Sequence, residues 1–163
     1  MTIAVGDEVP GVKIKVAAPT GGGEETSTRA LFEAKRVVMF GVPGAFTPTC
    51  STKHLPGFIE RAAELRAAGA DRIVCLSVND AFVMGAWGRE KGAFDAVTML
   101  ADGNGDFTRA LGLEVDLEAS HMGRRCRRFL AVFEAGRCAM IAVEEPGKLA
   151  ASTAEAALAF LKR

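Results

Sequence analysis

Residues 36–50 read RVVMFGVPGAFTPTC and decide the fold of this chain. The apolar run at their start has the length and composition of a buried strand, and the glycines and prolines that follow mark a turn. A helical pattern then runs from Thr49 to Ala68. The stretch therefore predicts a strand, a turn and a helix, with Cys50 in the first turn of the helix.

Cys50 is the best candidate nucleophile because of that position. The first turn of a helix carries unpartnered backbone N–H groups and a partial positive charge, which favour a thiolate over a thiol. Thr47 lies near enough in sequence for its hydroxyl to hydrogen-bond to the sulfur or to a ligand above it. Pro43 and Pro48 fix the backbone φ angle around the cysteine. The alternative is a buried cysteine that acts only as a small apolar side chain.

The segment PGAFTPTC at residues 43–50, followed by Ser51 and HLPGF at residues 54–58, closely resembles the active-site segment of the peroxiredoxins. The subfamily it resembles is the peroxiredoxin-five-like one (type II, atypical). The likeness extends through CLSVNDAFV at 75–83, WG at 87–88, LADGNGDF at 100–107 and RRF at 127–129. The resemblance implies a thioredoxin-like fold, a thiol peroxidase activity, and active-site roles for Pro43, Thr47, Cys50 and Arg128.

Composition sets the broad class of the protein. The 163 residues are enough for a single domain over 1–163, and 49% apolar with 25% charged residues is ordinary for a globular chain. Twenty basic and twenty acidic residues cancel, so no nucleic-acid or membrane partner is expected. The amino end has no targeting pattern, which makes a cytoplasmic location the default expectation. The four cysteines include no C-x-x-C pair, which argues against a disulfide scaffold and against the usual zinc clusters. No bound cofactor is expected.

Periodicity predicts alternating strands and helices along the rest of the chain. Strands are expected at residues 10–17, 36–40, 72–78, 96–100, 128–133 and 138–143, and helices at 28–34, 49–68, 81–91, 107–111 and 149–161. The second helix should bend at Pro56-Gly57. Glycines 21–23 predict a hairpin turn, and DGNGD at 102–106 predicts a turn that caps the helix after it. The order fits an α/β protein with a central mixed sheet flanked by helices, in the thioredoxin-like manner.

Thiolate formation alone cannot make an efficient peroxidase. A free thiol is already about 3% ionised at pH 7, so complete ionisation raises its rate roughly thirtyfold at most. The rest must come from holding the peroxide in line with the sulfur and from stabilising charge on the departing oxygen. Arginine suits this task, and if Arg128-Phe129 opens a strand, one arginine of the run RRCRR at 124–128 can point inward.

The resemblance assigns that inward role to Arg128. The implied mechanism is attack of the Cys50 thiolate on hydrogen peroxide or a small organic hydroperoxide, which leaves a sulfenic acid. Thr47 and nearby backbone N–H groups would hold the peroxide, and Pro43 would shield the pocket from water. Arg124, Arg125 and Arg127 are expected to form a solvated basic patch.

The other cysteines have separate expectations. Cys75 should be a core residue of a central strand, and Cys138 should pack within its own strand. The arginines that flank Cys126 should lower its pKa and allow mixed disulfides. Some members of the resembled subfamily carry a resolving cysteine before the last helix, but residues 146–153 here contain none. A one-cysteine cycle is therefore expected, with an external thiol reductant: glutathione with glutaredoxin, or thioredoxin.

Several alternatives remain open on the sequence alone. The main one is a redox-sensing or chaperone-like binding protein that is switched by oxidation of Cys50. A thiol–disulfide oxidoreductase is disfavoured because Thr47 stands where C-x-x-C needs its first cysteine. His54 follows Cys50 at helical spacing, as in a cysteine–histidine hydrolase, but no orienting partner is evident, and a structural or dimer-contact role is expected. Phe46 and Phe82 could supply the contact surface of a homodimer, and Trp87 should be packed in the core.

Overall fold

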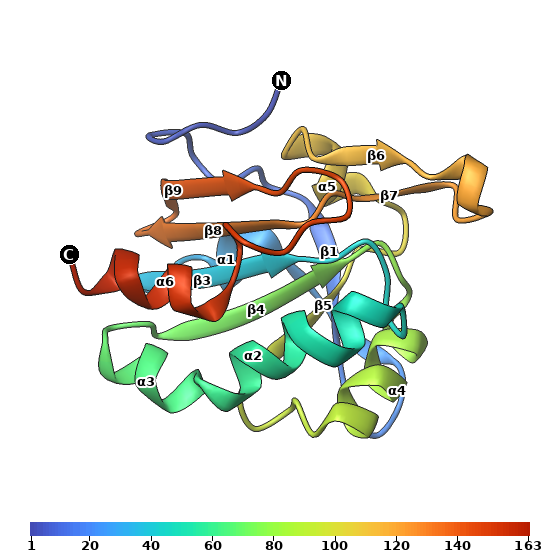
Figure 1. Ribbon diagram of the computed structural model, residues 1–163, viewed down its shortest axis with the longest axis horizontal. Coiled ribbons are helices and arrows are strands. Elements are labelled where there is room, and N and C mark those ends of the chain that lie inside the picture. The colour runs from blue at the N-terminus through green and yellow to red at the C-terminus, as the bar shows by residue number, and fades with distance from the viewer.

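A seven-stranded mixed sheet forms the centre of the computed structural model, which describes residues 1–163 (Figure 1). Its strand order is β2-β1-β5-β4-β3-β8-β9. The pairs β3 with β4 and β4 with β5 are parallel, whereas the pairs on either side of them are antiparallel. A separate two-stranded ribbon, β6 with β7, lies beyond the sheet. The predicted α/β class with a central mixed sheet is confirmed.

The strands are β1 (Lys13–Ala17), β2 (Gly23–Ser27), β3 (Arg36–Gly41), β4 (Arg72–Ser77), β5 (Thr98–Ala101), β6 (Glu114–Asp116), β7 (Arg124–Cys126), β8 (Phe129–Glu134) and β9 (Arg137–Val143). The helices are α1 (Thr28–Leu31), the π-helical turn η1 (Cys50–His54), α2 (Leu55–Glu60), α3 (Ala62–Ala67), α4 (Ala81–Lys91), α5 (Asp106–Ala110), the 3-10 turn η2 (Glu118–Ser120) and α6 (Ala154–Leu161).

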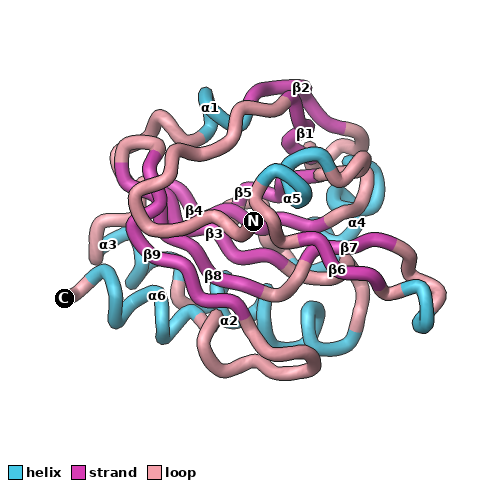
Figure 2. Tube along the Cα trace, turned by 90° about the horizontal axis from the view of Figure 1, so that it is seen from above, coloured by secondary structure: helices cyan, strands magenta, loops and turns pink.

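The sheet separates two apolar cores. On one face it packs against α2, α3, α4 and α6, through buried side chains such as Phe58, Trp87 and Leu158. On the other face it packs against α1, α5 and the N-terminal segment, through side chains such as Phe32 and Phe107. Figure 2 shows α1 and α5 on one side of the strands and α2 and α6 on the other. Successive residues of β3 alternate between the two cores, as expected for a strand covered on both faces.

Local signals place several of these elements. Asp80 caps α4 by accepting a hydrogen bond from the Val83 N–H (2.9 Å). The Asp102 carboxylate accepts from the N–H groups of Phe107 (3.2 Å) and Thr108 (2.8 Å), which confirms the predicted capping turn before α5. The glycine-rich segment after β1 forms the expected hairpin turn into β2.

The structure differs from the sequence prediction at several places. The last helix begins at Ala154 rather than residue 149, because Thr153 caps it by accepting from the Ala156 N–H. The irregularity expected at Pro56-Gly57 lies on either side of that pair, in the π-helical turn that ends at His54 and in a break at Arg61 between α2 and α3. The ribbon of β6 and β7 was not predicted, because two three-residue strands rich in charge carry almost no periodic signal.

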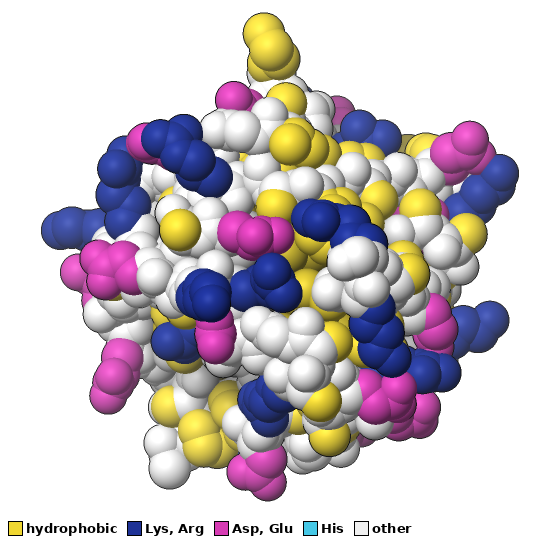
Figure 3. All heavy atoms as spheres, turned by 90° about the vertical axis from the view of Figure 1, so that its left-hand side faces the viewer, with side chains coloured by type: hydrophobic (Ala, Val, Ile, Leu, Met, Phe, Trp, Pro, Cys, Tyr) yellow, Lys and Arg dark blue, Asp and Glu magenta, His cyan; other side chains and the backbone are white.

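The surface mixes charges of both signs. Figure 3 views the side that is on the left of Figure 1, and there the basic and acidic side chains are interspersed. No helix in the structure is long and apolar enough to span a lipid bilayer.

Candidate active site

Cys50 is the first residue of η1, after the loop that follows β3. The turn is wider than an α-helical one, because the Leu55 N–H bonds to the Cys50 carbonyl, five residues earlier. The thiol is fully buried on the core face that carries α2 and α4. Its expected place at a helix start is confirmed.

Arg128 is the side chain that reaches the sulfur. It immediately precedes β8, which pairs antiparallel with β3. The start of β8 therefore lies beside the end of β3 and the loop that leads to Cys50. The Nη2 of Arg128 donates to Cys50 Sγ at 3.1 Å, and its Nη1 lies 2.8 Å from His54 Nδ1. The inward orientation predicted for one arginine of the run at 124–128 is therefore present in the structure.

His54 has the partner that the sequence did not reveal. Its ring is almost fully buried and packs beside Phe40 and Phe58. Burial lowers the pKa of His54 from 6.5 to about 4, with the charge of Arg128 adding to the effect and the bond to Ser152 opposing it. A neutral ring with its proton on Nε2 leaves Nδ1 free to accept from Arg128. The sequence did not reveal this partner because Arg128 lies 74 positions further along the chain.

The loop before Cys50 is held by side chains from other elements. The Thr47 hydroxyl donates to the Gly44 carbonyl (2.7 Å), so it makes a turn within the loop and does not bond the sulfur. The Ala45 N–H donates to Asn79 Oδ1 (2.9 Å). Phe46 adopts a positive φ of 63°, a strained conformation for a bulky residue that such fixed loops sustain.

The basic run at 124–128 contributes more than a solvated patch. Arg125 Nε donates to the Met122 carbonyl (2.8 Å), and its Nη1 lies 3.4 Å from the Pro43 carbonyl, so it ties β7 to the loop before Cys50. The role of Arg125 was missed because it depends on the unpredicted β7. Arg124 fits the surface expectation better: its side chain is 60% exposed and pairs with Glu114 and Asp116.

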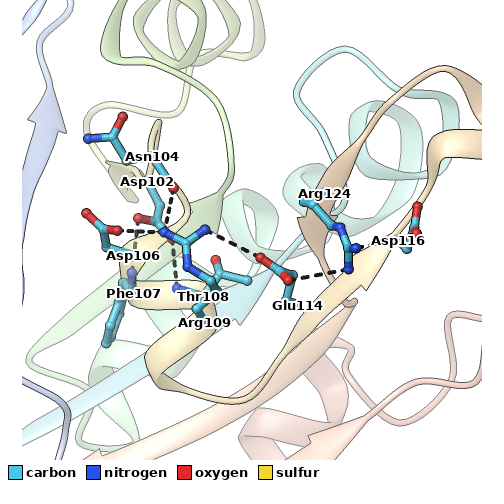
Figure 4. A network of polar contacts seen from close by, with 9 residues as sticks. All are labelled: Asp102, Asn104, Asp106, Phe107, Thr108, Arg109, Glu114, Asp116 and Arg124. Carbon is cyan, nitrogen blue, oxygen red and sulfur yellow. Dashed lines mark hydrogen bonds and ion pairs between the residues drawn. The ribbon is translucent and has the colours of Figure 1, made fainter.

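A polar network fastens the ribbon of β6 and β7 to α5 (Figure 4). Glu114 is shared between Arg109 (3.5 Å) and Arg124 (3.6 Å), and Arg109 also bonds Asp106 (2.6 Å) in the first turn of α5. Exposed pairs of this kind are individually weak, but a shared carboxylate fixes the ribbon relative to the helix.

A cavity of about 200 Å³ opens beside the site. Pro43, Thr49 and Arg128 are among its lining residues, together with Val115 of β6. The segment from Glu144 to Gly147 also lines it, as do Leu117 and Arg127. Cys50 is not among the lining residues, so the cavity adjoins the buried thiol through its hydrogen-bond partner Arg128.

All four cysteines are buried and none forms a disulfide. Burial raises the pKa of Cys75 and of Cys138, which lie in strands as predicted. Burial also raises the pKa of Cys126, so the expectation of a lowered pKa there was wrong. Cys126 points into the core on the far face of the sheet, where its flanking arginines do not compensate for the loss of water. No group of three or more His, Cys, Asp or Glu side chains is arranged to hold a metal ion.

The sheet topology and the contact between Arg128 and a thiol at a helix start place the chain among thiol-based oxidoreductases of thioredoxin-like fold. The family model described as Redoxin matches residues 4–158. Over 164 residues the chain is 49% identical to the chloroplastic peroxiredoxin-2E-2 of Oryza sativa subsp. japonica, which covers 98% of this chain and 73% of the relative. It is 46% identical to peroxiredoxin-2B of Arabidopsis thaliana, over 94% of each chain.

A solved structure of a relative supports the same family. Reduced Prx3 of Vibrio vulnificus, in complex with hydrogen peroxide, superposes with a TM-score of 0.92 at 43% identity, over 99% of this chain and 97% of that one. The chain belongs to the Redoxin family, and within it to the type II peroxiredoxins, which makes it a thiol peroxidase that reduces peroxides.

Proposed function

We propose that Cys50 is the peroxidatic cysteine and that Arg128 is its electrostatic partner. The observation that carries this assignment is the 3.1 Å bond from Arg128 Nη2 to Cys50 Sγ. A guanidinium stays charged at any working pH, so it stabilises a thiolate and any negative charge that develops beside it. None of the other three cysteines is hydrogen-bonded to an arginine side chain.

The proposed reaction is an in-line displacement. The Cys50 thiolate attacks the nearer oxygen of the peroxide, an S–O bond forms, and the O–O bond breaks. The sulfur loses two electrons and becomes a sulfenic acid, while the departing oxygen gains them and takes a proton to leave as water or an alcohol. Pro43 and Thr47 would border the peroxide, with Thr47 held in place by its bond to Gly44.

Hydrogen peroxide and small organic hydroperoxides are the proposed substrates. The relative Prx3 of Vibrio vulnificus binds hydrogen peroxide in its reduced form. The cavity beside the site, at about 200 Å³, has room for more than the two oxygen atoms of that molecule, so an alkyl group can be accommodated.

We also propose a one-cysteine cycle with an external reductant. Cys126 and Cys138 belong to the opposite core, so the sheet stands between them and Cys50. Cys75 shares the face of Cys50 but is fully buried within a central strand. Glutathione with glutaredoxin, or thioredoxin, would reduce the sulfenic acid through a mixed disulfide with release of water. Phe46 and Phe82, which are 50% and 71% exposed, would form part of a homodimer contact.

Stopped-flow fluorescence tests the assignment. Trp87 is the only tryptophan, and its Nε1 donates to the hydroxyl of Ser51, next to Cys50, so oxidation of Cys50 should change its emission. The wild type should respond to hydrogen peroxide far faster than free cysteine reacts, and Cys126→Ser should match it, whereas Cys50→Ser should not respond. A rate no higher than that of free cysteine would contradict the proposal and favour a slow redox sensor.

Reductant choice is tested separately with the oxidised enzyme. Turnover with glutathione and glutaredoxin, or with thioredoxin and its reductase, should persist in Cys75→Ser. Loss of all turnover in that variant would show that Cys75 resolves the sulfenic acid internally.

A further inference from the structure

Glu144 is a buried acidic residue that the reaction above does not use. It directly follows β9 and is only 6% exposed. No lysine or arginine pairs with it. A buried carboxylate without a cation is costly unless hydrogen bonds replace its water, so a structure that retains one gives it strong partners.

The partners of Glu144 are three donors from one short segment. Its Oε2 accepts from the N–H of Ala150 (2.7 Å), the N–H of Ser152 (2.8 Å) and the hydroxyl of Ser152 (2.7 Å). Burial alone would raise the pKa of Glu144, but these bonds outweigh it and lower the pKa, so the group is ionised at neutral pH. The carboxylate thus fixes the backbone of the segment before α6.

The fixed segment leads back to the active site. The carbonyl of Ser152 accepts from His54 Nε2 (2.8 Å), which sets the ring tautomer. The opposite nitrogen, Nδ1, then receives the bond from Arg128 Nη1 (2.8 Å). The backbone N–H of Glu144 also donates to the Arg128 carbonyl (2.9 Å), a bond that does not depend on the carboxylate.

We propose that Glu144 is a positioning residue for Arg128, whose carboxylate acts on the guanidinium through Ser152 and His54. The proposal rests on the role of Arg128 given above. An arginine side chain has several rotatable bonds, and only a fixed acceptor on Nη1 aims Nη2 at the sulfur. His54 supplies that acceptor only while the Ser152 carbonyl holds its proton on Nε2.

The test compares Glu144→Ala with Glu90→Ala. Glu90 is the control, because it is an exposed glutamate on α4, does not line the cavity, and makes no side-chain hydrogen bond or ion pair. Glu144→Ala should lower the second-order rate constant with hydrogen peroxide about tenfold, the effect of misaligning one hydrogen bond to a charged group. The midpoint of the pH dependence of Cys50 alkylation by iodoacetamide should move upward. Glu90→Ala should change neither.

A double-mutant cycle with Arg128→Met separates positioning from general damage to the fold. If Glu144 acts through Arg128, Glu144→Ala should cause little further loss of rate once Arg128 is absent. If the two losses multiply, the proposal is overturned. Should Glu144→Ala not fold, Ser152→Ala removes one of the three bonds to Glu144 and should give a smaller loss with the same non-additivity; strictly multiplicative losses there would also overturn it.

The two proposals fail in different ways. A slow reaction of the wild type with peroxide would contradict the role of Cys50 and Arg128. A fast wild type, together with Glu144→Ala indistinguishable from Glu90→Ala in both readouts, would contradict the positioning role alone.

Discussion

Acidification should destabilise the folded protein through His54. Burial lowers the pKa of His54 to about 4, whereas the exposed ring in the unfolded chain keeps a value near 6.5. Between these two pH values the unfolded chain binds the proton and the folded protein does not. The free energy of unfolding therefore falls as the pH is lowered from 6.5 to 4, and each pH unit in that window removes at most about 1.4 kcal/mol.

The full window corresponds to a loss of about 3 kcal/mol, which is a large part of the stability of an ordinary domain. The control is His54→Asn, which keeps an acceptor near the Nδ1 position but does not titrate. Glu144 has a lowered pKa, so its contribution to the free energy of unfolding is lost only as the pH falls through and below its ordinary value of 4.5. This loss is the same in the wild type and in His54→Asn.

Urea unfolding at half-unit pH intervals, followed by Trp87 fluorescence at one fixed protein concentration, measures the effect. The wild-type curve should drop below pH 6.5 relative to the His54→Asn curve. Two curves that run parallel between pH 6.5 and 4.5 would show that folding does not change the affinity of His54 for a proton, which contradicts the prediction.

Three further predictions concern packing and access. Gly41→Ala should lower the free energy of unfolding by about 2 kcal/mol or more, because an added Cβ would overlap the ring of Phe129; calorimetry that finds it neutral would show that the ring can move aside. Ser51→Ala should cost about 1 to 3 kcal/mol in urea unfolding, since it leaves the buried indole N–H of Trp87 without an acceptor; an unchanged midpoint would mean that water replaces the hydroxyl. Cys126 should resist iodoacetamide at pH 8 in the folded protein and react in urea, as peptide mass mapping can determine; rapid labelling of the native state would contradict its burial and raised pKa.

The strand, turn and helix around Cys50 could be predicted because each rests on a local signal. The apolar run of β3 has strand length, the prolines and glycines stop it, and a helical pattern follows from Thr49. The alternation of a strand also predicted that one arginine of the run at 124–128 points inward, and the resemblance to the peroxiredoxins identified it as Arg128.

The pKa of Cys126 and the contacts of His54 could not be predicted, because both depend on how the sheet packs. The arginines beside Cys126 are neighbours in sequence, but the thiol points into the far core, so burial dominates its pKa. His54 meets Arg128 and Ser152 through contacts that span 74 and 98 positions. Local periodicity carries no signal of either contact. The series of hydrogen bonds from Glu144 to the active site can therefore be identified only in the structure.

Oxidation of Cys50 by peroxide can be followed by mass spectrometry within seconds of mixing. After one equivalent of hydrogen peroxide, the wild type should gain a single oxygen atom or, with dimedone present, one dimedone adduct on the peptide that contains Cys50. Cys50→Ser should gain neither. The role of Cys50 would be contradicted if Cys50→Ser were oxidised as fast as the wild type, and a wild type that loses two hydrogens instead of gaining oxygen would contradict the one-cysteine cycle.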